Sequence, residues 1–190
     1  MAEAILTVDL PGPVAPERLA ELGAALRGFA DRCQEARPGS YDVAIEPGRL
    51  AVRVPEGGDS RARRFFINVA GPGFGDEGVF RAAHAADPDL EPLIGFTPTH
   101  DVVVCTNGGD LVDRLMVAEL AAVVQDVVGG VIDVKTARRA LEPMRSLPGV
   151  VALMDQQWWL RAFGSARFLR AWAAAPDFEL CRFGVTPVGI

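Results

Sequence analysis

Residues 100–134 read HDVVVCTNGGDLVDRLMVAELAAVVQDVVGGVIDV, and this stretch decides the fold class. His100–Cys105 is an apolar run of strand length, and Asp110–Val128 is long enough for a helix. A second apolar run, Val131–Val134, follows a pair of glycines. The order strand, glycine turn, helix, strand predicts a βαβ-like unit. Because apolar side chains fill two flanks of the helix, we expect it to be mostly buried.

The glycine turn before this helix raises the question of phosphate binding. A phosphate site at a helix start needs free backbone N–H groups and the positive end of the helix dipole. Asp110 is placed to cap the helix, and Asp113 adds a second carboxylate in its first turn. The glycine-rich loop Gly71–Gly75 likewise leads into acidic residues. Neither turn is therefore predicted to bind phosphate.

The rest of the chain alternates between strand and helix patterns. A helix is expected from Pro16, with an apolar stripe that continues to Cys33 and an end at Pro38. The pair Pro47-Gly48 predicts a type II turn within a hairpin. Strands are expected at 5–10, 41–45, 50–54, 64–70, 150–154, 158–163 and 178–183, and further helices at 76–85 and 165–174, with a helical turn at 138–141. This order predicts an α+β fold with a mixed, largely antiparallel sheet and helices packed on one side.

Length and composition favour one domain over residues 1–190. The halves 1–75 and 94–190 both begin with strand, helix and strands, which leaves internal duplication open. The three cysteines lie far apart and are odd in number, so neither a disulfide framework nor a zinc site is expected. The start of the chain lacks the pattern of a signal peptide, and no apolar run is long enough to span a bilayer. We expect a cytoplasmic protein without a membrane partner.

Charge is unevenly distributed along the chain. Residues 76–134 carry eleven acidic residues against Arg81 and Arg114, a net charge of −9. Nucleic-acid binding needs a basic face, so no nucleic-acid partner is expected. An acidic surface would attract a basic protein partner. A solvated surface with acidic helix caps would explain the same composition.

No catalytic constellation is evident, so catalytic, cofactor-binding and metal-binding residues are all predicted as none. Only two histidines occur, His84 and His100. Cys105 shares a strand with His100, but alternation places the two side chains on opposite faces. Carboxylate pairs can carry out acid–base chemistry without histidine, which leaves Glu119 or Asp133 as an alternative. A salt bridge with an arginine would explain Glu119 equally well.

Aromatic and charged residues in the second half are candidates for partner binding. Trp158 and Trp159 are adjacent in a predicted strand, so one is expected in the core and the other nearer the surface. An exposed tryptophan beside an arginine is a common anchor for a protein partner. The predicted partner-binding residues are Asp87, Asp89, Glu91, Asp155, Trp158, Trp159 and Arg161.

The second half also resembles a family of uncharacterised actinobacterial proteins, loosely similar to immunity proteins of polymorphic toxin systems. The resemblance covers residues 94–183. It lies in IGFTPTHDVVV at 94–104, GGDLVDRL at 108–115, GGVIDV at 129–134 and FLRAWAAAPDFEL at 168–180. It implies a fold and a role in binding, but no catalytic residue.

Three functions are therefore expected in order. The first is a non-enzymatic protein-binding domain, an immunity-type inhibitor of a basic toxin. The second is a small carboxylate-dependent hydrolase or transferase. The third is a structural or regulatory domain that oligomerises through an edge strand. The sequence does not indicate the oligomeric state.

Overall fold

The computed structural model describes residues 4–75, 77–85, 87–156 and 159–181. Its elements, in chain order, are β1 (Ala4–Leu10), α1 (Pro16–Phe29), β2 (Arg32–Arg37), β3 (Ser40–Ile45), η1 (Pro47–Leu50), β4 (Arg63–Ala70), α2 (Glu77–His84), α3 (Glu91–Ile94), β5 (His100–Thr106), α4 (Leu111–Val128), β6 (Val131–Thr136), η2 (Arg138–Ala140), α5 (Leu141–Arg145), β7 (Val150–Asp155), β8 (Leu160–Gly164) and α6 (Ala166–Ala173).

The eight strands form one sheet in the order β2-β3-β4-β5-β1-β6-β8-β7, and all neighbouring strands pair antiparallel. The predicted α+β class is confirmed. Since β5 and β6 flank β1 and both run antiparallel to it, they are parallel to each other. Helix α4 connects them, so the predicted βαβ-like unit is present, with β1 inserted between its strands.

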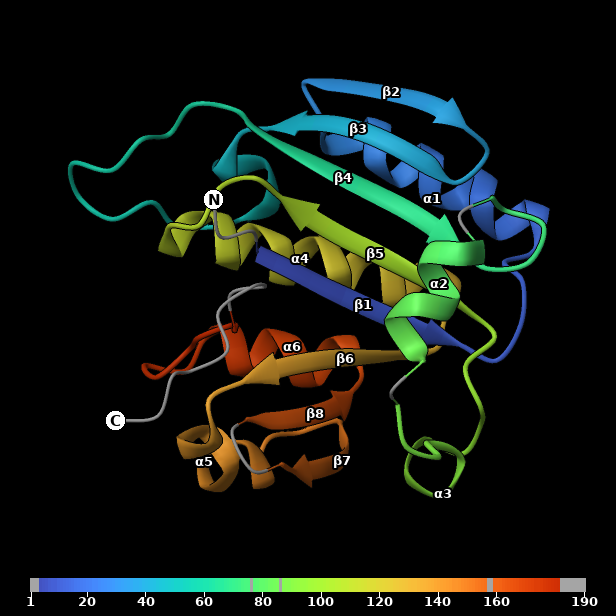
Figure 1. The fold of residues 1–190 in the computed structure, drawn as a ribbon. Helices are drawn as coiled ribbons and strands as arrows, with labels where there is room; N and C mark the ends of the chain where they lie inside the picture. The colour runs from blue at the N-terminus through green and yellow to red at the C-terminus, as the bar shows by residue number, and fades with distance from the viewer. Residues whose placement is uncertain (1–3, 76, 86, 157–158, 182–190) are drawn as a thin grey trace.

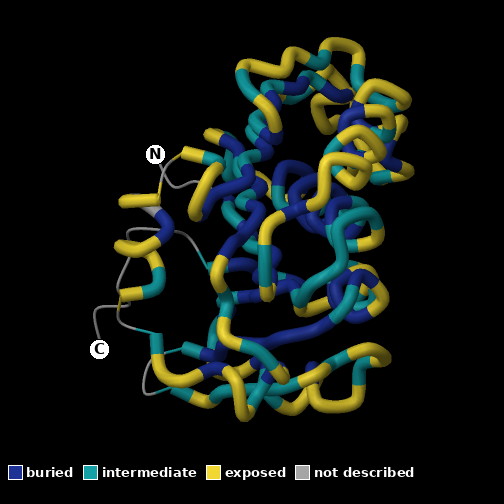
Figure 2. Tube along the Cα trace, turned by 90° about the vertical axis from the view of Figure 1, so that its right-hand side faces the viewer, coloured by how far each residue is buried: buried dark blue, intermediate teal, exposed yellow. Residues whose placement is uncertain are grey.

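The insertion of β1 means that the two halves of the sequence share one sheet. Helices α1, α4 and α6 pack together behind it, while helices α2 and α3 lie on the opposite face, called the front face below (Figure 1). Buried residues concentrate in the strands and α4 (Figure 2). The core behind the sheet includes Leu6 and Val8 from β1 and Met116 and Leu120 from α4.

Helix α4 begins with Asp110 as its cap, as its sequence predicted, and Asp113 completes a capping box. The Asp110 carboxylate accepts from the Asp113 N–H at 2.8 Å, and the Asp113 carboxylate accepts from the Asp110 N–H at 3.1 Å. Arg63 donates to both side chains at 2.8 and 2.7 Å. The positive end of the helix is therefore occupied by protein carboxylates.

Three local predictions were wrong. Helix α1 ends at Phe29, because Ala30 is extended and the Asp31 N–H donates to the Ala44 carbonyl, which starts β2 where the helix was expected to continue. The hairpin at Pro47-Gly48 is absent: this pair lies in η1, and β3 pairs with β2 and β4 instead.

The expected last strand is not formed over its described residues, Phe178–Cys181. Phe178 packs on Trp172 instead, with ring centroids 6.1 Å apart. The end of that prediction, residues 182–183, lies outside the described residues. No helix in the described ranges is both long and apolar enough to cross a membrane.

Candidate functional site

Three aspartates interrupt the apolar strands in the middle of the sheet. Asp9 in β1 lies directly opposite Asp101 in β5, and Asp133 in β6 lies opposite Thr7, two residues before Asp9. Because side chains alternate along a strand, this register places all three carboxylates on the front face. We call them the aspartate cluster.

The aspartate cluster is almost completely removed from solvent. Asp9 is 0 %, Asp101 2 % and Asp133 6 % exposed. Among the residues that the structure describes, neither carboxylate oxygen of Asp9 has a hydrogen-bond partner, and one oxygen each of Asp101 and Asp133 also has none. Burying a carboxylate without partners is costly, so four such oxygens in one place require a proton, a water molecule or a ligand.

Two cationic side chains border the cluster, and Asp87 joins them. His84, in the last turn of α2, lies 2.8 Å from Asp87 through Nδ1 and 3.2 Å from Asp101 through Nε2. Arg161 in β8 donates to both oxygens of Asp87, at 2.6 and 3.0 Å, and from Nε to Asp133 at 2.9 Å. These contacts connect the end of α2 to the three strands β5, β6 and β8.

The surroundings shift the proton affinities of these groups strongly. Burial, together with the nearby charge of Asp133, raises the pKa of Asp9 from 3.8 to about 7. Burial also raises the pKa of Asp133, although Arg161 opposes this shift. Hydrogen bonds to Asp101 and Asp87 raise the pKa of His84 from 6.5 to about 9. At neutral pH, His84 is therefore cationic and the Asp9 carboxyl is close to half protonated.

The pKa of Asp87 is shifted in the opposite direction to that of Asp9. Burial alone would raise the pKa of Asp87, but its hydrogen bonds to His84 and Arg161 outweigh burial and lower it. A site with one carboxyl partly protonated near neutrality beside the ionised carboxylate of Asp87 can both donate and accept protons. Within the described ranges, no group of three or more histidine, cysteine or acidic side chains is arranged to hold a metal ion.

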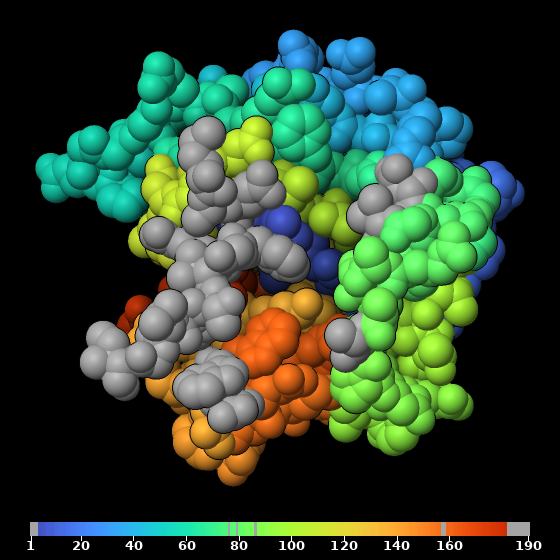
Figure 3. Space-filling view, in the orientation of Figure 1, coloured from blue at the N-terminus to red at the C-terminus, as the bar shows by residue number. Residues whose placement is uncertain are grey.

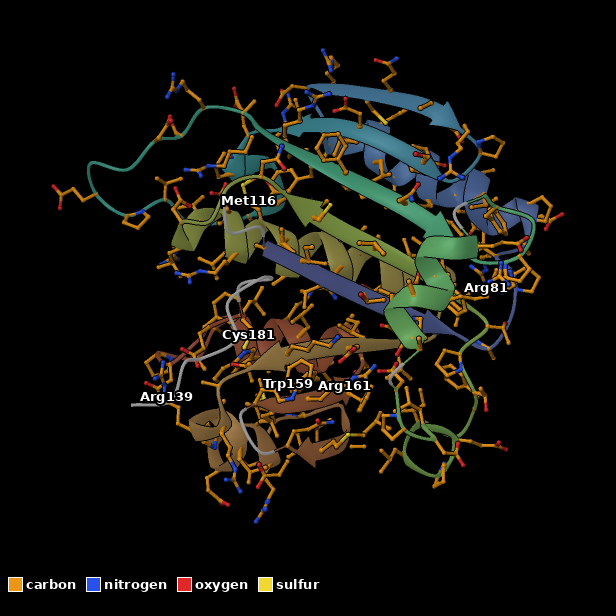
Figure 4. All side chains as sticks on the ribbon, in the orientation of Figure 1. Arg81, Met116, Arg139, Trp159, Arg161 and Cys181 are labelled. Atoms are coloured by element: carbon orange, nitrogen blue, oxygen red, sulfur yellow. The ribbon has the colours of Figure 1, made fainter. Side chains whose placement is uncertain are left out.

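The front face is partly open beside the cluster. Figure 3 shows atoms of β1 at the bottom of a hollow between the green atoms of α2 and the orange atoms of the β8 region. Thr7, Val103 and Lys135 on this face are half-buried. Figure 4 shows Trp159 and Arg161 close together on the same side of the sheet. Asp9 itself lies at the end of β1 that α2 covers (Figure 1).

A protein-family model described as a family of unknown function, DUF6368, matches residues 2–182. The chain belongs to this family. The DUF6368 match includes the N-terminal half, so it extends well beyond the resemblance seen at residues 94–183. A search of curated proteins and a search of solved structures each returned no match.

In this DUF6368 member, the residues predicted to bind a partner lie in different environments. Arg161 is 3 % exposed and Asp87 is half-buried beside it, so both belong to the network around the aspartate cluster. Asp89 and Glu91 are exposed near α3. Their role in partner binding stays a prediction.

The remaining predicted partner residues lie near β7 and β8. Asp155 accepts two hydrogen bonds from Arg138, at 2.5 and 2.6 Å. Trp159 is half-buried, and its indole N–H donates to Gln156 at 3.2 Å. Trp158 lies outside the described residues.

The acidic segment 76–134 is largely neutralised by cations. Besides Asp87, Asp101 and Asp133, four of its acids pair with arginines from distant parts of the chain: Arg63 bridges Asp110 and Asp113, and Arg170 bridges Glu119 and Asp126. The net charge of −9 therefore overstates the acidity of the surface.

The two carboxylates of the catalytic alternative are separated by the fold. Glu119 forms an ion pair with Arg170 of α6, on the helical layer behind the sheet. Asp133 lies in the aspartate cluster on the front face. Asp9, Asp101 and His84 were not predicted as site residues, although each aspartate interrupts an apolar strand.

Proposed function

We propose that this protein is a small acid–base enzyme, a hydrolase or transferase, whose reacting groups are the carboxyls of the aspartate cluster. The observation that carries this proposal is the Asp9 side chain, which is fully buried beside two further carboxyls, with no hydrogen-bond partner for either oxygen in the described part of the chain. Buried acids with strongly shifted pKa values are more frequent at catalytic sites than elsewhere. This favours the carboxylate alternative over the binding role that the sequence placed first.

In the proposed reaction, Asp9 is the general acid. It donates its proton to the leaving group, while Asp133, which Arg161 contacts, accepts a proton from the attacking nucleophile. Arg161 acts as a positioning residue, because its contact with Asp133 fixes one carboxylate oxygen. The imidazolium of His84 fixes Asp101 in the same way. This arrangement supplies one proton donor and one acceptor near neutral pH without free solvent at Asp9.

A substrate would approach from the hollow on the front face and must displace the cover over Asp9. Helix α2 is the proposed cover, since His84 bonds to Asp101 and Phe80 packs on the His84 ring with centroids 4.5 Å apart. Closure over buried acids excludes water, which strengthens the electrostatic interactions at the site.

The test uses the purified full-length protein and three chromogenic substrates: a nitrophenyl ester, a nitrophenyl phosphate and a nitrophenyl glycoside. We expect turnover of at least one, with a rate that falls as pH rises through about 7. D9N should lower kcat by about a hundredfold. E119Q is the matched control, because Glu119 lies on the opposite side of the sheet, and it should leave kcat unchanged. No turnover of any substrate, or equal activity of D9N and wild type, would contradict the proposal.

We also propose, as a second candidate, the inhibitor-type binding of a basic protein. It is favoured by Glu77, Asp89 and Glu91, three exposed acids around α2 and α3 without an ion pair in the described part of the chain. A pull-down with the product of a neighbouring gene tests this role. Loss of the complex in D89K/E91K would support it, and an unchanged complex would contradict it. The oligomerising role stays a prediction.

A further inference from the structure

The atoms of the aspartate cluster that lack a partner are all acceptors, and the donors beside them are already engaged. In the described part of the chain, these atoms are both carboxyl oxygens of Asp9, Oδ1 of Asp101 and Oδ1 of Asp133. Both ring nitrogens of His84 and all three guanidinium nitrogens of Arg161 are bonded to other carboxylate oxygens. A ligand of this site must therefore bring hydrogen-bond donors of its own.

The strand register brings these acceptors around one position. Asp9 and Asp101 are direct partners across β1 and β5, where Cβ atoms are about 5 Å apart. Asp133 is the partner of Thr7, so it is diagonal to Asp9, at a Cβ separation of up to about 7–8 Å. Burial is the main cause of the raised pKa of Asp9, and the charges of Asp133 and Asp101 add to it, so all three carboxyls act on one another. A group of a few atoms can contact all three.

The local charge favours a cationic donor over a neutral one. A hydrogen bond from a charged donor to a carboxylate is about twice as strong as one between neutral groups. Burial raises the pKa of Asp133, and the charges of Arg161 and Lys135 lower it, so cations already act on this carboxyl. Asp9, by contrast, forms no hydrogen bond to any described cation. An added positive charge is therefore attracted most strongly beside Asp9.

We propose that Asp9, Asp101 and Asp133 together bind a cationic nitrogen group of the substrate, an ammonium or a guanidinium, whose N–H groups donate to their unpartnered oxygens. This inference rests on the proposed function for the identity of the ligand as substrate, and access requires the same displacement of α2. A protonated carboxyl keeps one acceptor oxygen, so Asp9 can accept from the cation with one oxygen and donate its proton from the other. The site then recognises a substrate that carries a positive charge beside the reacting bond.

The experiment compares small ligands that separate charge from hydrogen bonding. Methylammonium and methylguanidinium carry the proposed group, methylurea is the neutral counterpart of methylguanidinium, and tetramethylammonium is a cation without N–H donors. Isothermal titration calorimetry measures the affinity of the purified full-length protein for each at neutral pH. We expect at least one of the two N–H cations to bind at least about tenfold more tightly than methylurea and tetramethylammonium. No binding of either N–H cation, or equal affinity for all the ligands, overturns the inference.

Two variants and one inorganic ion locate the binding. D9N replaces an acceptor by an amide N–H group that faces the cation, and we expect it to weaken binding by about tenfold or more. D89N, which removes an exposed carboxylate on the same side of the molecule, should leave the affinity unchanged. Equal weakening by D9N and D89N would mean that the cation binds the acidic surface in general, and this overturns the inference. Displacement of the N–H cation by an equal concentration of Mg²⁺ also overturns it.

Turnover of the chromogenic substrates separates this inference from the proposed function. Inhibition of turnover by the N–H cation that binds supports both. Cation binding that D9N weakens, without turnover of any nitrophenyl substrate, supports the cation site and contradicts the proposed enzyme. If D9N abolishes turnover while neither N–H cation binds the wild type, the proposed enzyme stands and the cation site is overturned.

Discussion

Asp9 and Asp101 lie directly opposite each other on β1 and β5, and both carboxyl groups are almost fully buried. Two facing carboxylates cannot both be ionised in such surroundings at low cost, because their charges repel and neither is hydrated. Asp101 is stabilised by His84, whereas no described residue forms a hydrogen bond with the Asp9 carboxyl. Asp101 therefore anchors α2 through His84, and Asp9 is the group whose pKa burial raises to about 7.

Replacing Asp9 by asparagine should change how stability depends on pH. The pKa of Asp9 is about 7 in the folded protein against 3.8 ordinarily, so the folded state loses stability as pH rises from about 4 to about 7. D9N lacks this loss, and its free energy of unfolding at about pH 8 should exceed that of wild type by about 1–3 kcal/mol. Urea unfolding across this range measures it.

The control for that experiment is D89N, which changes an exposed carboxylate on the same side of the molecule. It should keep the wild-type slope between pH of about 4 and about 7. A D9N protein with the same slope as wild type would show that Asp9 does not hold a proton in the folded state.

His84 should affect the free energy of unfolding at higher pH than Asp9 does. Because its pKa is raised to about 9 from 6.5, its stabilisation is complete below 6.5 and is lost as pH rises to about 9. H84Q should be less stable than wild type by about 1–3 kcal/mol at pH of about 6, with the difference shrinking toward pH of about 9. R81Q, at an exposed position of the same helix, should not show this convergence. A constant difference between H84Q and wild type would contradict the account.

Arg161 should be the most costly of the ion-pair residues to remove. R161M leaves Asp87 and Asp133 buried without their cation, which costs about 3–5 kcal/mol of unfolding free energy. R170M removes a half-exposed arginine from Glu119 and Asp126 and should cost under about 1 kcal/mol. Chemical denaturation measures the free energy of unfolding of both variants. Equal losses would contradict the account, because the buried network would then stabilise the fold no more than an exposed salt bridge does.

The capping box of α4 should contribute measurably to the free energy of unfolding. D110A removes the side chain that accepts from the Asp113 N–H and one partner of Arg63, and we expect a loss of about 1–2 kcal/mol. D126A, on the exposed side of the same helix, should cost under about 0.5 kcal/mol. Thermal unfolding of the two variants distinguishes them. If D110A were as stable as D126A, the cap would not support the helix.

The sequence was most informative where local pattern and packing agree. Helix α4 and strands β5 and β6 follow from their apolar runs and from Asp110 as a cap. The pattern failed at β2, because Cys33 continues the spacing of the α1 stripe although the chain has already left the helix at Ala30. Pro47-Gly48 is compatible with both a type II turn and η1, and pairing of β3 with β2 and β4 decides between them.

The candidate site could be predicted only in part. Asp9, Asp101 and Asp133 are each the one acid within an apolar strand, which is an available signal for a buried charge. Their convergence depends on the insertion of β1 between β5 and β6, a pairing of residues far apart in the chain. Arg63 and Arg170 are likewise far in sequence from the acids they neutralise, so the sequence did not reveal these ion pairs. The net charge of the acidic segment therefore suggested a surface for a partner.

The most direct test of the account is the titration of the Asp9 carboxyl in the folded protein. Carboxyl carbon chemical shifts of aspartate-labelled protein, assigned by the loss of one signal in D9N, follow its ionisation with pH. The account predicts a midpoint at about 7, because burial and the charge of Asp133 favour the protonated form. A midpoint near the ordinary value of 3.8 would contradict it, since Asp9 would then have no proton to donate at neutral pH.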